Sequence, residues 1–234
     1  MKNEILLIPD KPDIERDNLA KAWEQLGGEV MRIGKFWIKP ETKNKRVSIY
    51  GYDSFCLVLA QILEIEMLMP KDEMIARLNF KFLKRKMELQ EVGEVNNIEF
   101  PKFIKPVTPK LFKADVFNSV EKLKIKIEHI ESSEKLICSE IIKVDKEVRS
   151  FILNREIKDL AFYEGDGNIG IPKKFIKEFL KECDFDLPKT FVLDVGFNEK
   201  LGWFVIEFNS SWGAGLNFCK AEKVIDCIRE AAIN

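Results

Sequence analysis

Residues 191–197 (FVLDVGF) and 203–216 (WFVIEFNSSWGAGL) are the part of the sequence that says most about the fold. Apolar and polar side chains alternate in both runs, which is typical of strands, and the short segment NEKLG between them predicts an antiparallel hairpin. In the register that keeps the two kinds of side chain apart, Asp194 lies opposite Glu207. A slip by one residue would mix the two faces, so the pattern itself specifies the register.

One face of this hairpin is wholly apolar, and the other carries oxygen-bearing side chains. The apolar face holds Phe191, Leu193, Val195, Phe197, Phe204, Ile206 and Phe208. The other face gathers Asp194, Glu207 and Asn209, and the last two are about 7 Å apart along one strand. Two carboxylates and an amide offer the hard oxygen ligands that suit Mg²⁺ bound to phosphates.

The alternative interpretation of this face is a solvated surface, because antiparallel sheets commonly expose one polar side. The segment Ser-Ser-Trp-Gly-Ala-Gly (210–215) follows directly, and its glycines permit close approach of a ligand to the backbone. This loop favours a ligand site over a solvated face.

A second group of candidates lies in FIKPVTPKLFKADVF (103–117). Lys105 ends an apolar strand just before a proline, and a lysine in that position is a candidate phosphate contact. Lys110 and Lys113 follow in a loop flanked by proline, where an ordinary basic surface loop is the alternative. That alternative explains the two loop lysines better than it explains Lys105.

A third group lies in SEIIKVDKEVRSFI (139–152). Glu147 and Arg149 are two residues apart on a predicted strand, so they share a face and form a candidate clamp for a polyanionic ligand. A surface salt bridge of little energetic importance is the alternative for this pair. Glu140 ends the preceding strand, where backbone groups are in a position to bind a purine base.

The rest of the chain predicts an α/β lobe over residues 1–78 and an α+β domain over residues 79–234, with subdomains at about 99–139 and 140–234. In the lobe, strands are expected at 4–8, 29–33 and 47–50, and helices at 13–26 and 54–63. A charged helix is expected at 72–91, either continuous or broken near Asn79. Further strands are expected at 100–105, 136–142, 148–153 and 160–163, and further helices at 119–130, 172–183 and 221–233.

Composition excludes several classes of protein. The 234 residues carry 38 basic and 39 acidic side chains, which excludes nucleic-acid binding driven by bulk charge. Five cysteines without a C-x-x-C pair suit reduced thiols in the cytoplasm, and the single histidine excludes three-histidine zinc sites. The first residues contain too short an apolar run for a signal peptide or a membrane span, so no membrane partner is expected.

With these motifs in order, the chain resembles the ATP-grasp superfamily, and within it the compact clade named for two arginines and a lysine, found often in phages and bacteria. The motifs are F-I-K-P at 103–106, a loop lysine, a strand-end Glu140, E-x-R-x-F at 147–151, V-x-D at 192–194 and V-I-E-F-N-S-S-W-G at 205–213. The resemblance covers about residues 80–220. It implies an α+β fold in which two subdomains clasp ATP, preceded by a small Rossmann-like α/β lobe.

The resemblance also implies an enzyme, an ATP- and Mg²⁺-dependent ligase that joins the carboxylate of a small molecule or peptide to an amine through an acylphosphate. It casts Lys105 and Lys110 as phosphate contacts, and Glu140, Ile141 and Ile142 as adenine contacts. It makes Arg149 a contact of the phosphates or the acylphosphate, and it lets Glu147 meet the ribose or orient Arg149. The implied catalytic residues are thus Arg149, Lys110 and Glu147, and the implied magnesium ligands are Asp194, Glu207 and Asn209.

The chain also departs from the clade. Its phosphate-covering loop usually carries glycine, but residues 112–115 (FKAD) carry none, and Ala114 disfavours a positive φ. The second signature arginine is Arg85 or, as second choice, Arg155; a place on a surface helix is the alternative for Arg85. Trp212 either lines the nucleotide or acceptor site or belongs to the core. Two other functions stay open, a non-catalytic nucleotide-binding module and a phosphotransferase acting on a hydroxyl.

Overall fold

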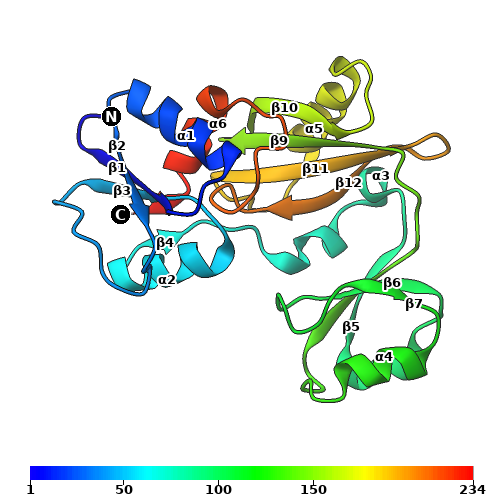
Figure 1. Ribbon diagram of the computed structural model, residues 1–234. Helices are drawn as coiled ribbons and strands as arrows, with labels where there is room; N and C mark the ends of the chain where they lie inside the picture. The colour runs from blue at the N-terminus through cyan, green and yellow to red at the C-terminus, as the bar shows by residue number, and fades with distance from the viewer. Residues whose placement is uncertain (234) are drawn as a thin grey trace. The chain divides into compact units, whose positions relative to one another are not determined.

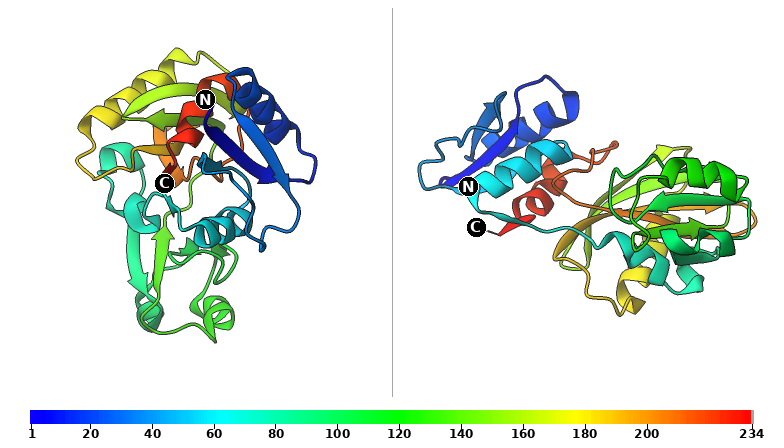
Figure 2. Two further views of the ribbon diagram at one scale, coloured as in Figure 1. Left: turned by 90° about the vertical axis from the view of Figure 1, so that its left-hand side faces the viewer. Right: turned by 90° about the horizontal axis from the view of Figure 1, so that it is seen from below.

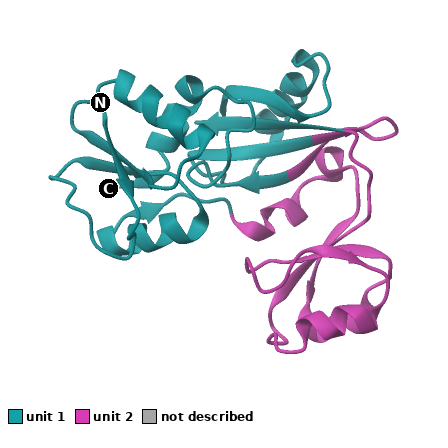
Figure 3. Ribbon diagram, viewed as in Figure 1, with its two compact units in different colours: residues 1–70, 146–195, 207–234 teal, residues 71–145, 196–206 magenta. Residues whose placement is uncertain are grey.

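The computed structural model describes residues 1–233, and these residues form two compact units (Figure 3). The first unit contains residues 1–70, 146–195 and the chain from 207 onward, and the second contains residues 71–145 and 196–206. The boundaries predicted at residue 78 and at about residue 139 are defined by sequence motifs and not by spatial compactness. These boundaries stay a prediction.

The first unit begins with three parallel strands in the order β2-β1-β3. These strands are β1 (Glu4–Pro9), β2 (Glu29–Ile33) and β3 (Arg46–Ile49), and the helices beside them are α1 (Ile14–Gln25) and α2 (Asp53–Leu63). Alternate residues of β1 enter two different cores, with Leu6 and Ile8 packing towards α1 and Ile5 and Leu7 towards α2. Both faces of β1 are therefore buried, which explains its nearly continuous apolar sequence. The description of this lobe as Rossmann-like stays a prediction.

A four-stranded sheet in the order β10-β9-β11-β12 follows, and its hairpin tip belongs to the second unit. The strands are β9 (Lys146–Leu153), β10 (Glu156–Glu164), β11 (Thr190–Asn198) and β12 (Gly202–Asn209). The helices are α5 (Gly170–Glu182) and α6 (Ala221–Arg229), and α1 packs against α6 (Figures 1 and 2). The expected hairpin at residues 191–208 is confirmed.

Helices cover both faces of this sheet. Val192 lies in one core with residues of α1 and α6. The ring centroid of Phe208, by contrast, lies 5.9 Å from that of Phe191 and 6.0 Å from that of Phe179 on α5. Neither face of β11 is therefore open to solvent, and every residue from Thr190 to Gly196 is buried.

The second unit is built on an antiparallel sheet in the order β5-β8-β6-β7. The strands are β5 (Met87–Glu91), β6 (Lys102–Pro106), β7 (Asp115–Phe117) and β8 (Lys135–Ser139), and the helix α4 (Val120–Ile127) packs on the sheet. Shorter helical turns are η1 (Asp72–Arg77), α3 (Phe80–Leu83) and η2 (Val92–Asn97).

The break considered near Asn79 is present, between η1 and α3, but the expected continuation of the helix to residue 91 is wrong. Lys84 adopts a left-handed conformation, φ 53°, which ends α3 after four residues, and Met87–Glu91 then pairs along β8 as a strand. Backbone pairing with a buried neighbour overrides the helix propensity of a charged segment. The helix expected at 221–233 likewise ends at Arg229, and Ala232–Ile233 forms β13, which pairs with β4 (Glu66–Met67).

None of the helices described between residues 1 and 233 has the length and apolar composition that a bilayer-spanning segment needs. All five cysteines are free thiols and all are buried.

Candidate active site

The three oxygen-bearing side chains of the β11–β12 hairpin lie together. The Nδ2 atom of Asn209 donates hydrogen bonds to Asp194 Oδ2 at 3.1 Å and to Glu207 Oε1 at 2.9 Å. Asp194 comes from β11, and the other two residues come from the end of β12. The structure thus gathers them on one side of the hairpin, as the alternation of the sequence predicts.

Asp194 is fully buried, with 0% of its surface exposed, so the alternative of a solvated face is wrong for this residue. Its carboxylate accepts two hydrogen bonds from Arg149, from Nε to Oδ1 at 2.9 Å and from Nη2 to Oδ2 at 2.6 Å. Arg149 lies on β9, the strand next to β11. This two-pronged geometry is the strongest form of an arginine–carboxylate pair.

Asp194 and Arg149 each change the pKa of the other. Burial raises the pKa of Asp194 to about 6, and the hydrogen bonds and charge of Arg149 oppose this rise. Burial also disfavours the charged form of Arg149, but the hydrogen bond and charge of Asp194 more than offset this effect, so the pKa of Arg149 is raised. The pair is therefore ionised at neutral pH.

The guanidinium of Arg149 keeps hydrogen-bonding capacity after these contacts. It has five N–H groups, of which two bind Asp194 and one on Nη1 binds the carbonyl of Gly215 at 2.9 Å. Two N–H groups have no acceptor among these contacts. Arg149 is thus held firmly and is still able to bind an anion.

Glu147 has a different partner from the one considered in the sequence. Its carboxylate accepts a hydrogen bond from the hydroxyl of Tyr163 on β10, and the hydrogen bonds of Arg149 go to Asp194 and Gly215. The Tyr163 ring centroid lies 5.6 Å from Cζ of Arg149, a distance at which a cation and an aromatic ring attract. Sequence reasoning missed Tyr163; the available signal was a tyrosine at the end of the strand that follows E-x-R.

The loop after β12 is held by side chains from the N-terminal part of the first unit. Glu15 on α1 accepts hydrogen bonds from the backbone N–H groups of Leu216 and Asn217, each at 2.8 Å. Tyr50 donates to the carbonyl of Ala214 at 2.9 Å. A Cβ at Gly215 would lie 2.8 Å from Oε2 of Glu15, so the glycine allows this close approach.

Trp212, in the same loop, belongs to the core. It is 4% exposed, packs with residues of β1, β3 and α2, and donates from Nε1 to the carbonyl of Leu68 at 2.9 Å. Of the roles considered for Trp212, the structure shows the core role.

Glu15→Ala is expected to lower the free energy of unfolding by about 2 kcal/mol, because two partly buried N–H groups lose a charged acceptor. Urea unfolding followed by circular dichroism measures this change. Glu24→Ala, an exposed position on the same helix, is the matched control and should change stability by less than about 0.5 kcal/mol. Equal effects of the two substitutions would show that the Glu15 contacts do not stabilise the loop.

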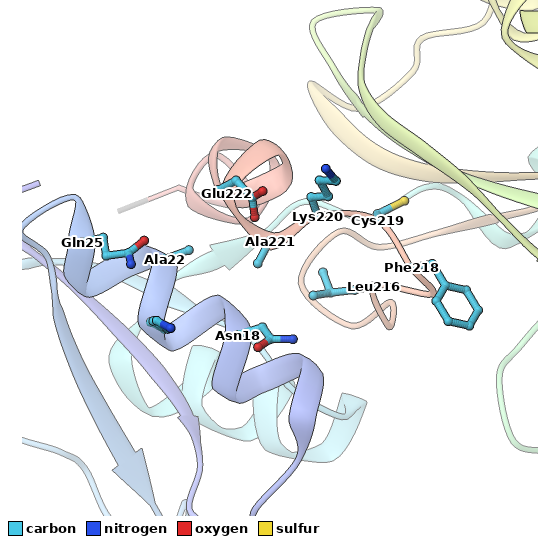
Figure 4. A pocket seen from close by; sticks show the side chains of 10 residues that line it. Asn18, Ala22, Gln25, Leu216, Phe218, Cys219, Lys220, Ala221 and Glu222 are labelled. Carbon is cyan, nitrogen blue, oxygen red and sulfur yellow. The ribbon is translucent and has the colours of Figure 1, made fainter. Parts of the chain in front are cut away.

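A cavity of about 650 Å³ lies beside the end of this loop (Figure 4). Asn18, Ala22 and Gln25 of α1 line one side, and residues 216 and 218–222 line the other. Its lining includes none of the residues predicted to bind nucleotide or metal, so it is separate from the predicted site.

The second unit carries the remaining predicted nucleotide contacts. Lys105 is half-buried on β6, opposite Ile137 of β8. Glu140 follows the end of β8, and its carboxylate accepts a hydrogen bond from the backbone N–H of Lys86 at 2.7 Å. Ile141 is 48% exposed and Ile142 is half-buried. The structure thus brings residues 140–142 to a strand end, and their role at a purine stays a prediction.

The loop between β6 and β7 places its positive φ at Lys110, which is exposed and has φ 69°. Ala114 does not have a positive φ, so this alanine is compatible with the loop as it stands. Lys113 is exposed.

The expectation that Arg85 lies on a surface helix is wrong. Arg85 is 7% exposed, and it donates from Nε to Ser139 Oγ at 3.2 Å and from Nη1 to the carbonyl of Val205 at 2.8 Å. Burial lowers its pKa to about 10. Arg155, the second choice, donates to three carbonyls around the end of α5, those of Leu180, Cys183 and Phe185.

Arg85→Met is expected to destabilise the protein by about 2 kcal/mol, because buried acceptors on β12 and on Ser139 lose their donor. Guanidinium chloride unfolding measures the loss. Arg77→Met is the control, since its ion pair with Glu73 is 56% exposed on the arginine side and contributes little. If the free energies of unfolding of Arg85→Met and Arg77→Met agree within about 0.5 kcal/mol, the structural role of Arg85 is contradicted.

The chain was compared with protein families, curated protein sequences and solved structures. Residues 82–227 match the family described as ATP-grasp domain, R2K clade family 2. A search of curated protein sequences gives no significant match. Among solved structures, the RimK domain ATP-grasp protein of Sphaerobacter thermophilus is 14% identical with a TM-score of 0.65, over 96% of this chain and 99% of that one.

Two further solved structures are similar. D-cycloserine synthetase DcsG is 11% identical with a TM-score of 0.64, over 97% of this chain and 99% of that one. D-alanine–D-alanine ligase from Bacillus anthracis is 13% identical with a TM-score of 0.56, over 97% and 96%, and the same ligase has been solved with ATP. At these identities the likeness establishes the fold.

Proposed function

This chain belongs to the ATP-grasp superfamily, in its R2K clade, and from this premise we propose that it is an ATP- and Mg²⁺-dependent ligase that joins a carboxylate to an amine through an acylphosphate. The ATP-grasp family and the ATP-grasp fold implied by the sequence motifs are confirmed. The observation that carries the proposal is the gathering of Asp194, Glu207 and Asn209 beside Arg149.

The donor set fits a magnesium ion. Among residues 1–233 no three histidine, cysteine, aspartate or glutamate side chains are grouped to hold a metal, but the candidate set has two carboxylates and an amide. One carboxylate oxygen of Asp194 and one of Glu207 already converge on the Asn209 amide, whose N–H hydrogens carry partial positive charge. Hard oxygen ligands of this kind are the ones that Mg²⁺ prefers. A bound Mg²⁺ would neutralise charge on the phosphates during transfer.

The residues of the first unit then have separate tasks. Asp194 holds Arg149 through two hydrogen bonds, and the two remaining N–H groups of Arg149 bind phosphate oxygens. Glu147 has a carboxylate oxygen left to accept a ribose hydroxyl. In the second unit, Lys105 and Lys110 supply positive charge for phosphates, and residues 140–142 supply adenine contacts.

The proposed reaction has two balanced steps. An oxygen of the acceptor carboxylate attacks the γ-phosphorus, the bond to the β–γ bridging oxygen breaks, and ADP leaves. The amine nitrogen then attacks the acyl carbon of the acylphosphate, inorganic phosphate leaves, and the nitrogen loses a proton. Positioning and charge neutralisation are what such a transfer requires of a protein.

The acceptor is proposed to be a small molecule or a peptide. The neighbours include a D-alanine–D-alanine ligase, and a macrocyclase solved with its precursor peptide. They support the class of reaction and do not identify the acid or the amine.

Incubating the chain with ATP, Mg²⁺, pooled amino acids and pooled peptides tests the proposal. Equal release of ADP and phosphate that requires at least one of the two pools, with a hydroxamate formed when hydroxylamine replaces the amine, is the expected result. ADP without phosphate would identify a phosphotransferase. ATP binding without ADP release would favour the non-catalytic module.

A further inference from the structure

Tyr163 occupies an irregular position in the sheet. On β10, Phe162 pairs with Val148 and Glu164 pairs with Glu147, so Tyr163 has no partner of its own on β9. A register shift of this kind is typical of a β-bulge, which bends a strand and increases its local twist, and such bulges occur often beside functional sites. The irregularity lies directly across from the Glu147–Arg149 pair.

The Tyr163 side chain contacts both members of that pair. Its hydroxyl donates to the carboxylate of Glu147, and its ring lies against the guanidinium of Arg149 at 5.6 Å. Burial and the hydrogen bond to Glu147 raise the pKa of Tyr163 well above its ordinary value, so the hydroxyl remains a donor. One side chain therefore links two residues that do not bond to each other.

The hydroxyl itself argues against simple space filling. The chain has 18 phenylalanines and 3 tyrosines, so its packing rarely uses a ring with a hydroxyl. Two of the tyrosine hydroxyls bind at this site or its loop, Tyr163 to Glu147 and Tyr50 to the carbonyl of Ala214. A phenylalanine at position 163 would fill the same space, but the carboxylate of Glu147 would lose its hydrogen bond from the tyrosine hydroxyl.

We propose that Tyr163 is a positioning residue of the nucleotide site. It fixes Glu147 and Arg149 relative to each other, so that Arg149 presents its two remaining N–H groups to phosphate and Glu147 presents an acceptor to a neighbouring hydroxyl. This inference rests on the proposed function for the identity of the ligand. It concerns a residue that contacts Glu147 and Arg149 and acts through them.

The first test measures binding of Mg²⁺ and the non-hydrolysable analogue AMP-PNP by calorimetry. Tyr163→Phe, which keeps the ring and removes the hydroxyl, should bind about 10-fold more weakly than the wild type. Tyr163→Leu, which removes both contacts, should bind about 50-fold more weakly. Tyr52→Phe makes the same chemical change at a tyrosine packed against Phe36 and Phe55, and should bind within about 2-fold of the wild type.

The second test needs no ligand. The Nε–H signal of Arg149 in the ¹⁵N spectrum, assigned by its absence in Arg149→Met, is expected to move in Tyr163→Leu because the ring-current shift is lost. It should stay near its wild-type position in Tyr163→Phe, where the ring is retained. A general packing defect would move many signals across the spectrum, whereas loss of the ring contact moves the Nε–H signal of Arg149.

The outcomes separate the two proposals. Absence of nucleotide binding by the wild type overturns the proposed function, and the Arg149 signal then decides alone whether the Tyr163 ring lies against the guanidinium. If the wild type binds the nucleotide and both Tyr163 variants bind it as tightly as the wild type, the positioning role is overturned. An Arg149 signal that is unchanged in Tyr163→Leu overturns it as well.

Discussion

Arg149→Met is expected to lower the free energy of unfolding by about 3–5 kcal/mol at pH 7. Asp194 is fully buried, and Arg149 supplies both of its charged hydrogen-bond donors, so the substitution leaves a carboxylate without a counter-ion. Methionine keeps much of the volume of the arginine stem, so the loss measures the charge rather than a cavity. Urea unfolding of both proteins at several pH values measures it.

The pH dependence of this variant has a definite sign. With Arg149 present, the pKa of Asp194 in the folded state is already about 6, against 3.8 for the free side chain, and burial is the main cause. Without the arginine, its hydrogen bonds and charge no longer oppose the effect of burial, so the folded-state pKa of Asp194 rises further. The native state then binds more protons than the unfolded state between pH 4 and the raised pKa, and stability increases as pH falls from 7 to 5.

The double variant Arg149→Met, Asp194→Leu is the matched control. It removes both charges, and its stability at pH 7 should lie above that of Arg149→Met and depend little on pH in this range. A single variant as stable as the wild type, with no gain on acidification, would show that the buried pair does not form.

Glu207→Gln is expected to reduce Mg²⁺-dependent ADP release by at least about 100-fold, because a proposed metal ligand loses its charge. Stability should change by less than about 1 kcal/mol, since Glu207 is only half-buried and an amide oxygen still accepts from Asn209 Nδ2. Initial rates of ADP formation at varied Mg²⁺ concentration measure the effect once a turnover condition is known.

Glu199→Gln provides the control for Glu207→Gln. It makes the same change in the turn of the same hairpin. The hydrogen bond from Glu199 to Asp145 comes from the backbone N–H, so the substitution keeps it. Its rate and its Mg²⁺ dependence should match those of the wild type. Equal rates for the two variants would falsify the assignment of Glu207 to the metal.

The contrast between Glu207 and Asp194 separates two roles that the resemblance does not distinguish. Both residues are assigned to magnesium, but only Asp194 is fully buried and tied to an arginine on a neighbouring strand. We therefore expect the stability loss to be large at Asp194 and small at Glu207, while both substitutions weaken Mg²⁺-dependent nucleotide binding.

Sequence reasoning was least successful where distant segments decide burial. Arg85 stands in a charged segment with helix propensity, and nothing local indicates that its guanidinium binds the carbonyl of Val205 on β12. Residues 87–91 form a strand because β8 is available as a partner. Tyr163 was missed because its role depends on a register shift between β9 and β10, which leaves no trace in the apolar pattern.

The sequence by itself determined that Asp194, Glu207 and Asn209 share one side of a hairpin, because side chains alternate with a period of two along any strand. Its motifs also determined the family. Only the tertiary structure decided that Arg149 is the partner of Asp194 and that Tyr163 links Glu147 to Arg149. The order of strands and the covering of the sheet by helices depend on packing between segments far apart in the chain, and local alternation carries no information about either.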